Sequence, residues 1–143
     1  MKQLSERKTM GKSLSSCGIT VLRIVVGAVF LAHGAQKLFV YHIAGVTGMF
    51  SHIGIPLPAL SATVVSLVEF VGGIALVLGV ATRLAAALIA IDMLVAILAV
   101  HLKNGFFMPS GYEFPLTLLA ANICLVLTGG GCASVDGLLR KKS

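Results

Sequence analysis

Four long apolar stretches, separated by connections of unequal length, dominate the sequence. They cover residues 19–40, 59–80, 84–102 and 114–127. A helix needs about 20 predominantly apolar residues to cross a hydrocarbon layer about 30 Å thick. The first three stretches reach that length, and the fourth needs residues 129–131 to complete its span. The pattern therefore predicts four transmembrane segments.

The residues that punctuate these stretches favour helices over strands. Pro56 and Pro58 precede the second stretch, and Pro115 falls in the first turn of the fourth. Proline is tolerated at helix starts, where its missing N–H would be unpaired anyway. Alternation of apolar and polar residues at period two is absent, which argues against an outer-membrane barrel. The predicted fold is an all-α membrane protein, a bundle of four transmembrane helices.

Composition and charge agree with a membrane protein. The mean hydropathy is +1.01, 57% of residues are hydrophobic and 11% are charged, whereas soluble domains carry about 25% charged residues. These values exclude a water-soluble globular domain, and also a disordered chain, which needs low hydrophobicity. The net charge is +6. Its basic residues lie mostly in tails beside apolar runs, so we expect them to set membrane orientation and not to bind nucleic acid.

The distribution of basic residues predicts that both termini are cytoplasmic. They gather in the N-terminal tail (Lys2, Arg7, Lys8, Lys12), in the second connection (Arg83) and in the C-terminal tail (Arg140, Lys141, Lys142). Cytoplasmic loops carry the excess of Lys and Arg in inner-membrane proteins. We therefore divide the chain into a basic tail (1–18), a membrane domain (19–137) and a second basic tail (138–143). A cleaved signal peptide is the alternative for the first stretch.

Cysteine spacing gives no sign of redox or metal chemistry. Cys17, Cys124 and Cys132 all map to the predicted cytoplasmic half, where thiols stay reduced. They form no C-x-x-C pair, so the sequence contains neither a thioredoxin-like motif nor a zinc motif. The histidines also lack ligand spacing, and no metal site is predicted.

Polar residues inside the apolar stretches are the main functional signal. Each ionisable side chain near the bilayer centre costs about 2.5–3.5 kcal/mol on insertion scales and so requires a partner or a purpose. The set comprises Arg23, His33, Gln36, Lys37, Glu69, Asp92, His101, Glu113 and Asn122.

Helical spacing and depth predict how these groups pair. His33, Gln36 and Lys37 are three and four residues apart, so they share one helix face. From depth along the helices, the expected pairs are Glu69–His33, Lys37–Glu113 and Arg23–Asp92. The Arg23–Asp92 pair is interpreted as structural, since buried pairs can simply fix helix register.

The other polar groups are interpreted as a site in the external half of the membrane. His33, Glu69 and His101 are the candidate catalytic residues. The candidate ligand-binding residues are Gln36, Lys37, Gly72, Gly73 and Glu113. A buried Glu can carry a proton, and His beside Glu forms a plausible proton relay or a hydrogen-bonding site for a quinone carbonyl.

With these residues assembled, the chain resembles the DoxX family of small four-helix membrane proteins. The resemblance covers about residues 22–137 and rests on several segments in order: residues 22–23, Gly27, Phe30, 33–39, 69–73, Gly79, 82–83, His101, 105–107, 111–113 and 129–136. Membership implies a polytopic protein of the bacterial inner membrane. The family is named for a subunit of a thiosulfate–quinone oxidoreductase, and relatives are associated with quinone, catechol or thiol-stress responses.

Three hypotheses for function follow. The first is a membrane subunit or small enzyme in quinone- or thiol-linked redox, with quinone as the possible ligand. The second is a proton-coupled permease for a small compound, which would need a homo-oligomer because four helices are few. The third is a noncatalytic scaffold that holds an oxidoreductase partner through the external connections, residues 41–58 and Phe106–Phe107.

Overall fold

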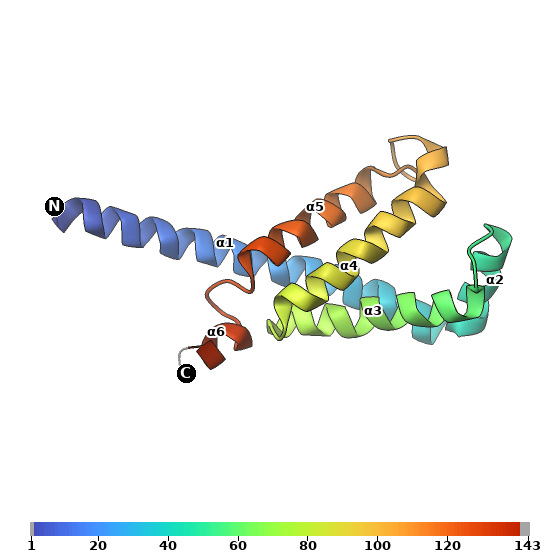
Figure 1. The fold of residues 1–143 in the computed structure, drawn as a ribbon, viewed down its shortest axis with the longest axis horizontal. Helices are drawn as coiled ribbons and strands as arrows, with labels where there is room; N and C mark the ends of the chain where they lie inside the picture. The colour runs from blue at the N-terminus through green and yellow to red at the C-terminus, as the bar shows by residue number, and fades with distance from the viewer. Residues whose placement is uncertain (1, 141–143) are drawn as a thin grey trace.

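The computed structural model describes residues 2–140, and every regular element in that range is a helix (Figure 1). The elements are α1 (Lys2–Ala35), the π-helical segment η1 (Gln36–Val40), α2 (His42–His52), α3 (Pro58–Leu78), α4 (Thr82–Ala96), the π-helical segment η2 (Ile97–His101), the short 3-10 turn η3 (Leu102–Asn104), α5 (Glu113–Thr128) and α6 (Val135–Arg140). Lys141 and Lys142 of the predicted C-terminal tail lie outside the described residues, as do the side chains of Lys2, Arg7, Lys8, Lys12 and Arg140.

The apolar stretches are helices, as the hydropathy pattern predicts. Ser13–Val40, Pro58–Leu78 and Thr82–Asn104 are each long and apolar enough to cross a membrane. The fourth helix, Glu113–Thr128, is shorter. It ends before the glycines that were expected to extend it, because Gly129 adopts a positive φ of 82° and terminates it. The molecule is therefore an all-helical, multi-pass membrane protein with three long apolar helices and one shorter one.

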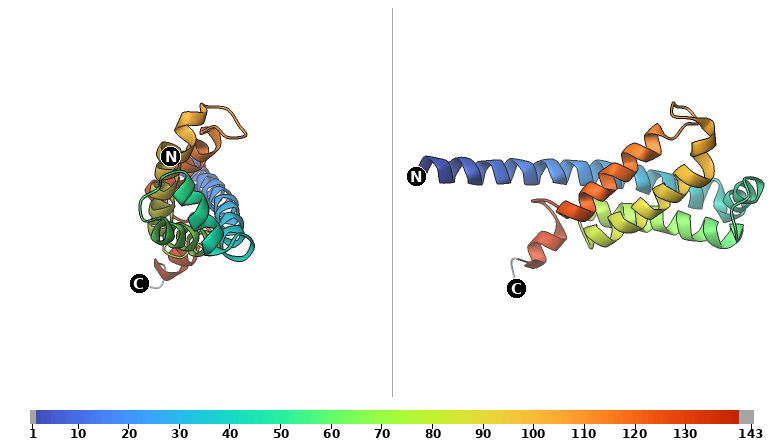
Figure 2. Two further views of the ribbon diagram at one scale, coloured as in Figure 1. Left: turned by 90° about the vertical axis from the view of Figure 1, so that its right-hand side faces the viewer. Right: turned by 45° about the horizontal axis from the view of Figure 1, so that its top comes forward.

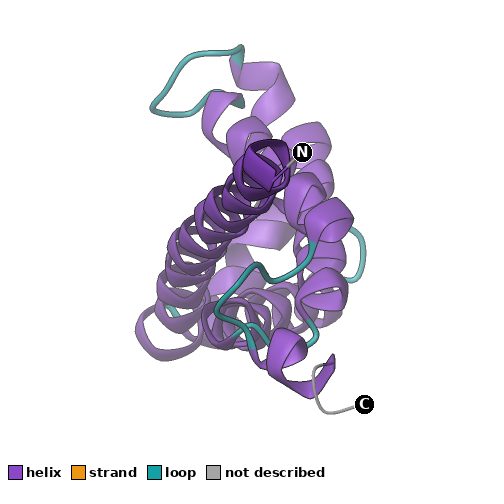
Figure 3. Cartoon of the chain, turned by 90° about the vertical axis from the view of Figure 1, so that its left-hand side faces the viewer, coloured by secondary structure: helices purple, strands orange, loops and turns teal. Residues whose placement is uncertain are grey.

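Two helix pairs make up the body of the molecule. Helix α1 lies along α3, and α4 lies along α5. A tight turn joins α3 to α4, with Gly79 and Ala81 both at positive φ. The two pairs meet at the end that carries this turn and diverge toward the other end (Figure 2). Seen from the left-hand side of Figure 1, the N-terminal end of α1 points toward the viewer and all regular elements within residues 2–140 are helices (Figure 3).

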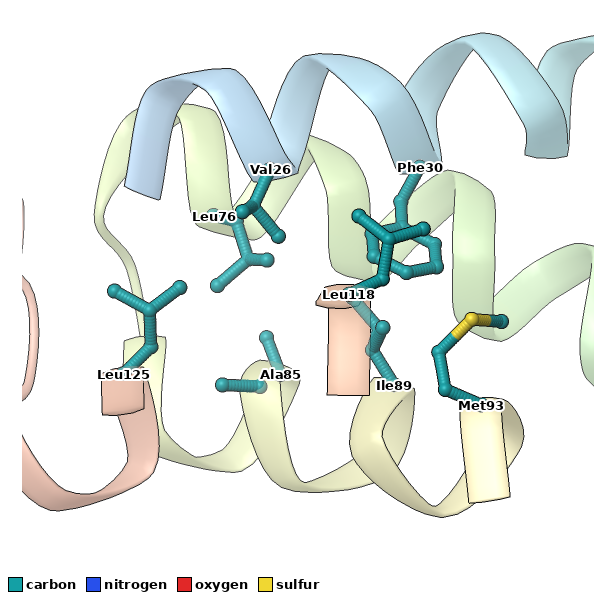
Figure 4. Close-up of a cluster of buried hydrophobic side chains, with 9 residues drawn as sticks. Val26, Phe30, Leu76, Ala85, Ile89, Met93, Leu118 and Leu125 are labelled. Atoms are coloured by element: carbon teal, nitrogen blue, oxygen red, sulfur yellow. The ribbon is translucent and has the colours of Figure 1, made fainter. Parts of the chain in front are cut away.

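A hydrophobic core fills the region where the pairs meet. Helix α1 contributes Val26 and Phe30, α3 contributes Leu76, and α4 contributes Ile89, with further members from α4 and α5 (Figure 4). Many large apolar side chains point outward instead, among them Val25, Val71, Leu88, Leu98 and Leu127. An exposed apolar surface of this extent is the surface that lipid covers in a membrane protein.

A short helix covers the diverging end of the α1–α3 pair. Helix α2 lies in the connection 41–58, and its Val46 and Phe50 pack on Ala62 of α3. This small second core packs on the N-terminal end of α3, on the same side of the molecule as the polar residues described next.

Candidate functional site

An ion pair between Lys37 and Glu69 joins α3 to the segment that follows α1. The Lys37 ammonium donates a hydrogen bond to Oε2 of Glu69. The Glu69 side chain is 5% exposed and that of Lys37 is 19% exposed. A carboxylate buried to this degree needs a charged partner, and Lys37 provides it. Lys37 stands in η1, and single π-helical turns occur often at functional sites.

Close packing of α1 on α3 explains why these two residues meet. A Cβ added at Gly34 would lie 2.4 Å from the backbone N of Phe70, so the two backbones touch there. Phe70 directly follows Glu69. Lys37 comes three residues after Gly34, about 60° around the helix from the contact line at about 100° per residue. Its long side chain therefore reaches Glu69 across the interface.

Asp92 of α4 is the third charged group at this site. Its carboxyl interacts electrostatically with Glu69 and with Lys37. Its Oδ2 atom is buried, and within the described part of the chain this oxygen has no hydrogen-bond partner. Two carboxyl groups therefore share one ammonium, and one oxygen remains able to accept a hydrogen bond. We call Lys37, Glu69 and Asp92 the charged triad.

The pairs expected for Glu69 and Lys37 are wrong. His33 and Gln36 are exposed, and Glu69 is held by Lys37. His33, Gln36 and Lys37 do follow one stripe of the helix, but Lys37 lies nearest the α3 contact line and the other two turn away from it. His33 is therefore not placed beside Glu69.

Glu113, at the start of α5, and His101, at the end of η2, instead contact the connection between these two elements. Glu113 accepts a 2.7 Å hydrogen bond from the backbone N–H of Met108. Nδ1 of His101 lies 2.9 Å from the carbonyl oxygen of Ser110. The α4–α5 pair diverges from α1 at this end, so equal depth in the membrane does not bring Glu113 to Lys37 (Figure 1). Both residues order their own loop.

The expected Arg23–Asp92 pair is also wrong, because Arg23 binds backbone carbonyls. Its side chain is 1% exposed. It donates to Leu76 and Val77 near the end of α3, and to Gly130 and Ala133 in the segment after α5. The last carbonyls of a helix lack intrahelical partners and carry partial negative charge, so they accept readily from a cation. Arg23 therefore links α1 to α3 and to the segment after α5, and does not pair with Asp92.

The expected ligand space at Gly72 and Gly73 is filled by neighbouring helices. A Cβ added at Gly73 would lie 2.4 Å from the backbone N of Leu31, and one at Gly72 would lie 3.0 Å from Cδ1 of Ile89. These glycines allow close helix contact, as small residues commonly do in membranes.

The role of Asp92 in the triad is the main residue assignment that sequence reasoning missed. Glu69 and Asp92 both stand near the middle of their spans. Their equal depth in the membrane could therefore have suggested, from sequence alone, that Glu69 and Asp92 lie close together. Within residues 2–140, no three His, Cys, Asp or Glu side chains gather in a way that could hold a metal ion.

The fold and the triad define a class: a multi-pass helical membrane protein with a charged site inside its apolar helices. The DoxX family model matches residues 18–102. The chain belongs to the DoxX family, which confirms the resemblance seen in the sequence.

Several relatives extend this result over nearly the full chain. A Bacillus subtilis protein named "Putative oxidoreductase CatD" is 34% identical over 92% of this chain and 93% of its own length. The Escherichia coli "Inner membrane protein YqjF" is 31% identical over 92% of this chain and 98% of its own length. A Mycobacterium tuberculosis protein, "Uncharacterized membrane protein Rv3486", is 35% identical over 87% of this chain and 83% of its own length. No solved structure matches the chain significantly. The protein is accordingly an inner-membrane protein.

Proposed function

We propose that this protein serves quinone- or thiol-linked redox in the membrane by binding a quinone-like head group at the charged triad. The observation that carries the proposal is the imbalance of charge in the triad: Lys37 pairs with Glu69 and also interacts electrostatically with Asp92, whose buried Oδ2 has no hydrogen-bond partner among the described residues. The name of the Bacillus relative, an oxidoreductase, is consistent with this proposal.

The chemistry of the triad suits a quinone and its reduced form. A quinone carbonyl accepts hydrogen bonds, which the Lys37 ammonium supplies, and a quinol hydroxyl donates them, which the Asp92 carboxylate accepts. The triad has one ammonium, on Lys37, and two carboxyl groups, on Glu69 and Asp92. One of the carboxyl groups can therefore hold a proton. Its own residues therefore bind the head group and manage a proton, while the electrons come from an oxidoreductase partner.

We further propose that α5 completes a fourth crossing, which puts both termini in the cytoplasm. Support comes from one end of the bundle. There the backbone N–H of Cys132, just after α5, donates to the carbonyl of Ser16 near the start of the first span. The carboxylate of Asp136 accepts from the N–H groups of Ala81 and Thr82 in the α3–α4 turn. The segment after α5 therefore returns to the end that carries Arg83.

Binding of a short-chain quinone analogue to the protein in lipid nanodiscs tests the proposed site. Glu69→Gln and Asp92→Asn keep the shape of the side chain and remove one charge each. We expect each to raise the Kd about tenfold or more, because a hydrogen bond to a charged group contributes about 1.5–3 kcal/mol. Glu113→Gln is the matched control, since this carboxyl binds its own loop, and its Kd should stay unchanged.

Two results contradict the proposal. One is a well-folded native protein that binds no quinone analogue. The other is equal weakening by Glu113→Gln, which would mean that loop order and not the triad controls binding. Proton-gradient-driven uptake of a small compound into proteoliposomes, lost in Glu69→Gln without any quinone binding, would favour the permease alternative.

A further inference from the structure

Two cysteines that lie far apart in the sequence meet at the end of the bundle opposite α2. Cys17 is on α1, and Cys132 lies between α5 and α6. Their Sγ atoms are 3.3 Å apart, and both residues are exposed. A separation of 115 residues hides this pair from any spacing motif. The absence of a C-x-x-C motif therefore does not mean the absence of a cysteine pair.

The backbone around Gly131 holds Cys132 against α1. Gly131 has a φ of 76°, and an added Cβ would lie 2.5 Å from Oγ1 of Thr20 and 2.6 Å from the carbonyl oxygen of Ser16. No other residue type fits there without displacing α1. The N–H of Cys132 then donates to Ser16 at 3.3 Å.

Arg23 fixes the same segment from its other side. Its Nε donates to the Gly130 carbonyl at 2.9 Å, and its Nη2 donates to the Ala133 carbonyl at 2.6 Å. The backbone of residues 130–133 is thus bound to α1 on both flanks of Cys132. These contacts of residues 130–133 with α1 bring the two sulfur atoms together.

The surroundings make Cys132 the better nucleophile of the pair. The Thr20 hydroxyl, 3.5 Å from its sulfur, and the Cys17 thiol both lower the pKa of Cys132 by hydrogen bonding to the thiolate. The thiolate is the reactive form of cysteine. A cavity of about 280 Å³ is lined by Ser16 and Gly131, which adjoin Cys17 and Cys132 in the sequence, and by Gly130, Ser134 and Asp136 among others. Both cysteines are exposed, so a small disulfide can reach their sulfurs from outside the bundle.

We propose that Cys17 and Cys132 form a dithiol–disulfide redox site that exchanges with disulfides of small thiol compounds. The Cys132 thiolate attacks one sulfur of the incoming disulfide; that S–S bond breaks, and one small thiol leaves with a proton. Cys17, on losing its own proton, attacks the Cys132 sulfur and releases the second small thiol. Two protein thiols and one disulfide become one protein disulfide and two small thiols, so two electrons pass from the protein to the small disulfide.

This site is independent of the proposed quinone site. Cys17 and Lys37 are 20 residues apart along α1 and η1, which is about 30 Å at about 1.5 Å per residue. Failure of quinone binding would leave the cysteine proposal intact, and the reverse also holds.

Exposure of the purified full-length protein to oxidised glutathione tests the proposal. The readouts are the number of thiols that still react with a maleimide of high mass, counted by gel shift, and peptide mass spectrometry. The native chain has three cysteines. We expect it to lose two of its three reactive thiols and to yield a reducible cross-link between the peptides that contain Cys17 and Cys132. Cys124→Ser is the matched control and should form the same cross-link.

The single variants separate the two steps. In Cys17→Ser, we expect a glutathione mixed disulfide to accumulate on Cys132, because the resolving thiol is gone. In Cys132→Ser, Cys17 should be modified more slowly. The proposal is overturned if the native chain forms no 17–132 cross-link, if Cys124 enters the disulfide instead, or if the mixed disulfide accumulates equally in the native chain and in Cys17→Ser.

Discussion

Arg23 shows how one charged residue is made compatible with an apolar interior. Its guanidinium is buried, and its donors are used by carbonyls of α3 and of the segment after α5. The planar group with several donors suits this task better than a lysine ammonium would. Arg83, at the same end of the molecule, is exposed and donates to Leu127 at 3.3 Å. The two arginines are therefore a natural comparison of buried and exposed cations.

Replacement of Arg23 should strongly destabilise the protein. Arg23→Leu removes the side-chain donor that serves the carbonyls of Val77, Gly130 and Ala133, and a buried carbonyl left without a donor costs about 1–3 kcal/mol. We expect a loss of about 3 kcal/mol or more, seen as a lower thermal unfolding midpoint in detergent. The control, Arg83→Leu, removes an exposed contact and should stay within about 0.5 kcal/mol of the native chain. Equal midpoints for the two variants would mean that the carbonyl contacts of Arg23 contribute little.

At the scale of elements, the contact between α1 and α3 decides which polar residues meet. Gly34 and Gly73 bring the two backbones into contact. Helix pairs in membranes rely on such small residues, because lipid provides no hydrophobic drive for association. The charged triad lies directly beside this contact, so its geometry depends on the spacing of the helices.

A methyl group at Gly34 should therefore damage both stability and the triad. Gly34→Ala forces α1 away from Phe70, and overpacking of this kind costs about 1–3 kcal/mol. We expect a lower unfolding midpoint, and a weakened Lys37–Glu69 pair that makes the stability effect of Glu69→Gln smaller in this background. Gly18→Ala on the same helix is the control: nothing lies within 4 Å of its added Cβ, so it should be neutral or slightly stabilising. An unfolding midpoint for Gly34→Ala equal to that of Gly18→Ala would contradict close contact at this crossing.

At the scale of the whole molecule, the length of α5 bears on how many times the chain crosses the membrane. Helix α5 has 16 residues, about 24 Å at about 1.5 Å per residue, somewhat less than the hydrocarbon thickness. Modest local thinning of the bilayer accommodates such a helix. The contacts of Cys132 and Asp136 with α1 and the α3–α4 turn favour a full return.

Reporter fusions measure the crossings directly. We expect alkaline phosphatase to be active when fused after Asn104, because the α4–α5 connection is external in the proposed topology. Fused after the last residue, it should be inactive, while a fluorescent protein there should be bright, since α5 returns the chain to the cytoplasm. An active phosphatase at both positions would mean that α5 does not cross.

The hydropathy pattern predicts the all-helical class and the positions of the apolar helices, but not the short helices α2 and α6. Residues 59–80 were expected and Pro58–Leu78 is observed, and residues 84–102 correspond to Thr82–Asn104. Such prediction succeeds because the backbone N–H and C=O groups of a segment in lipid must form hydrogen bonds within that segment. A sufficiently long apolar stretch therefore becomes a helix, whatever helices lie beside it. The family resemblance rests on the same local segments.

The partners of the polar residues were decided only by tertiary structure. The sequence shows which polar residues lie inside the apolar stretches, and depth and helical phase suggest pairs among them. It does not show that α1 packs on α3 through Gly34, nor that the α4–α5 pair diverges from α1 away from the α3–α4 turn. Those facts pair Lys37 with Glu69 and turn His33 outward. At the other end of the bundle, the contacts of residues 130–133 with α1 bring Cys17 to Cys132 across 115 residues. Burial of a segment is a local property of its composition, whereas contact between two side chains depends on the relative position of whole helices, which no single stretch of sequence encodes.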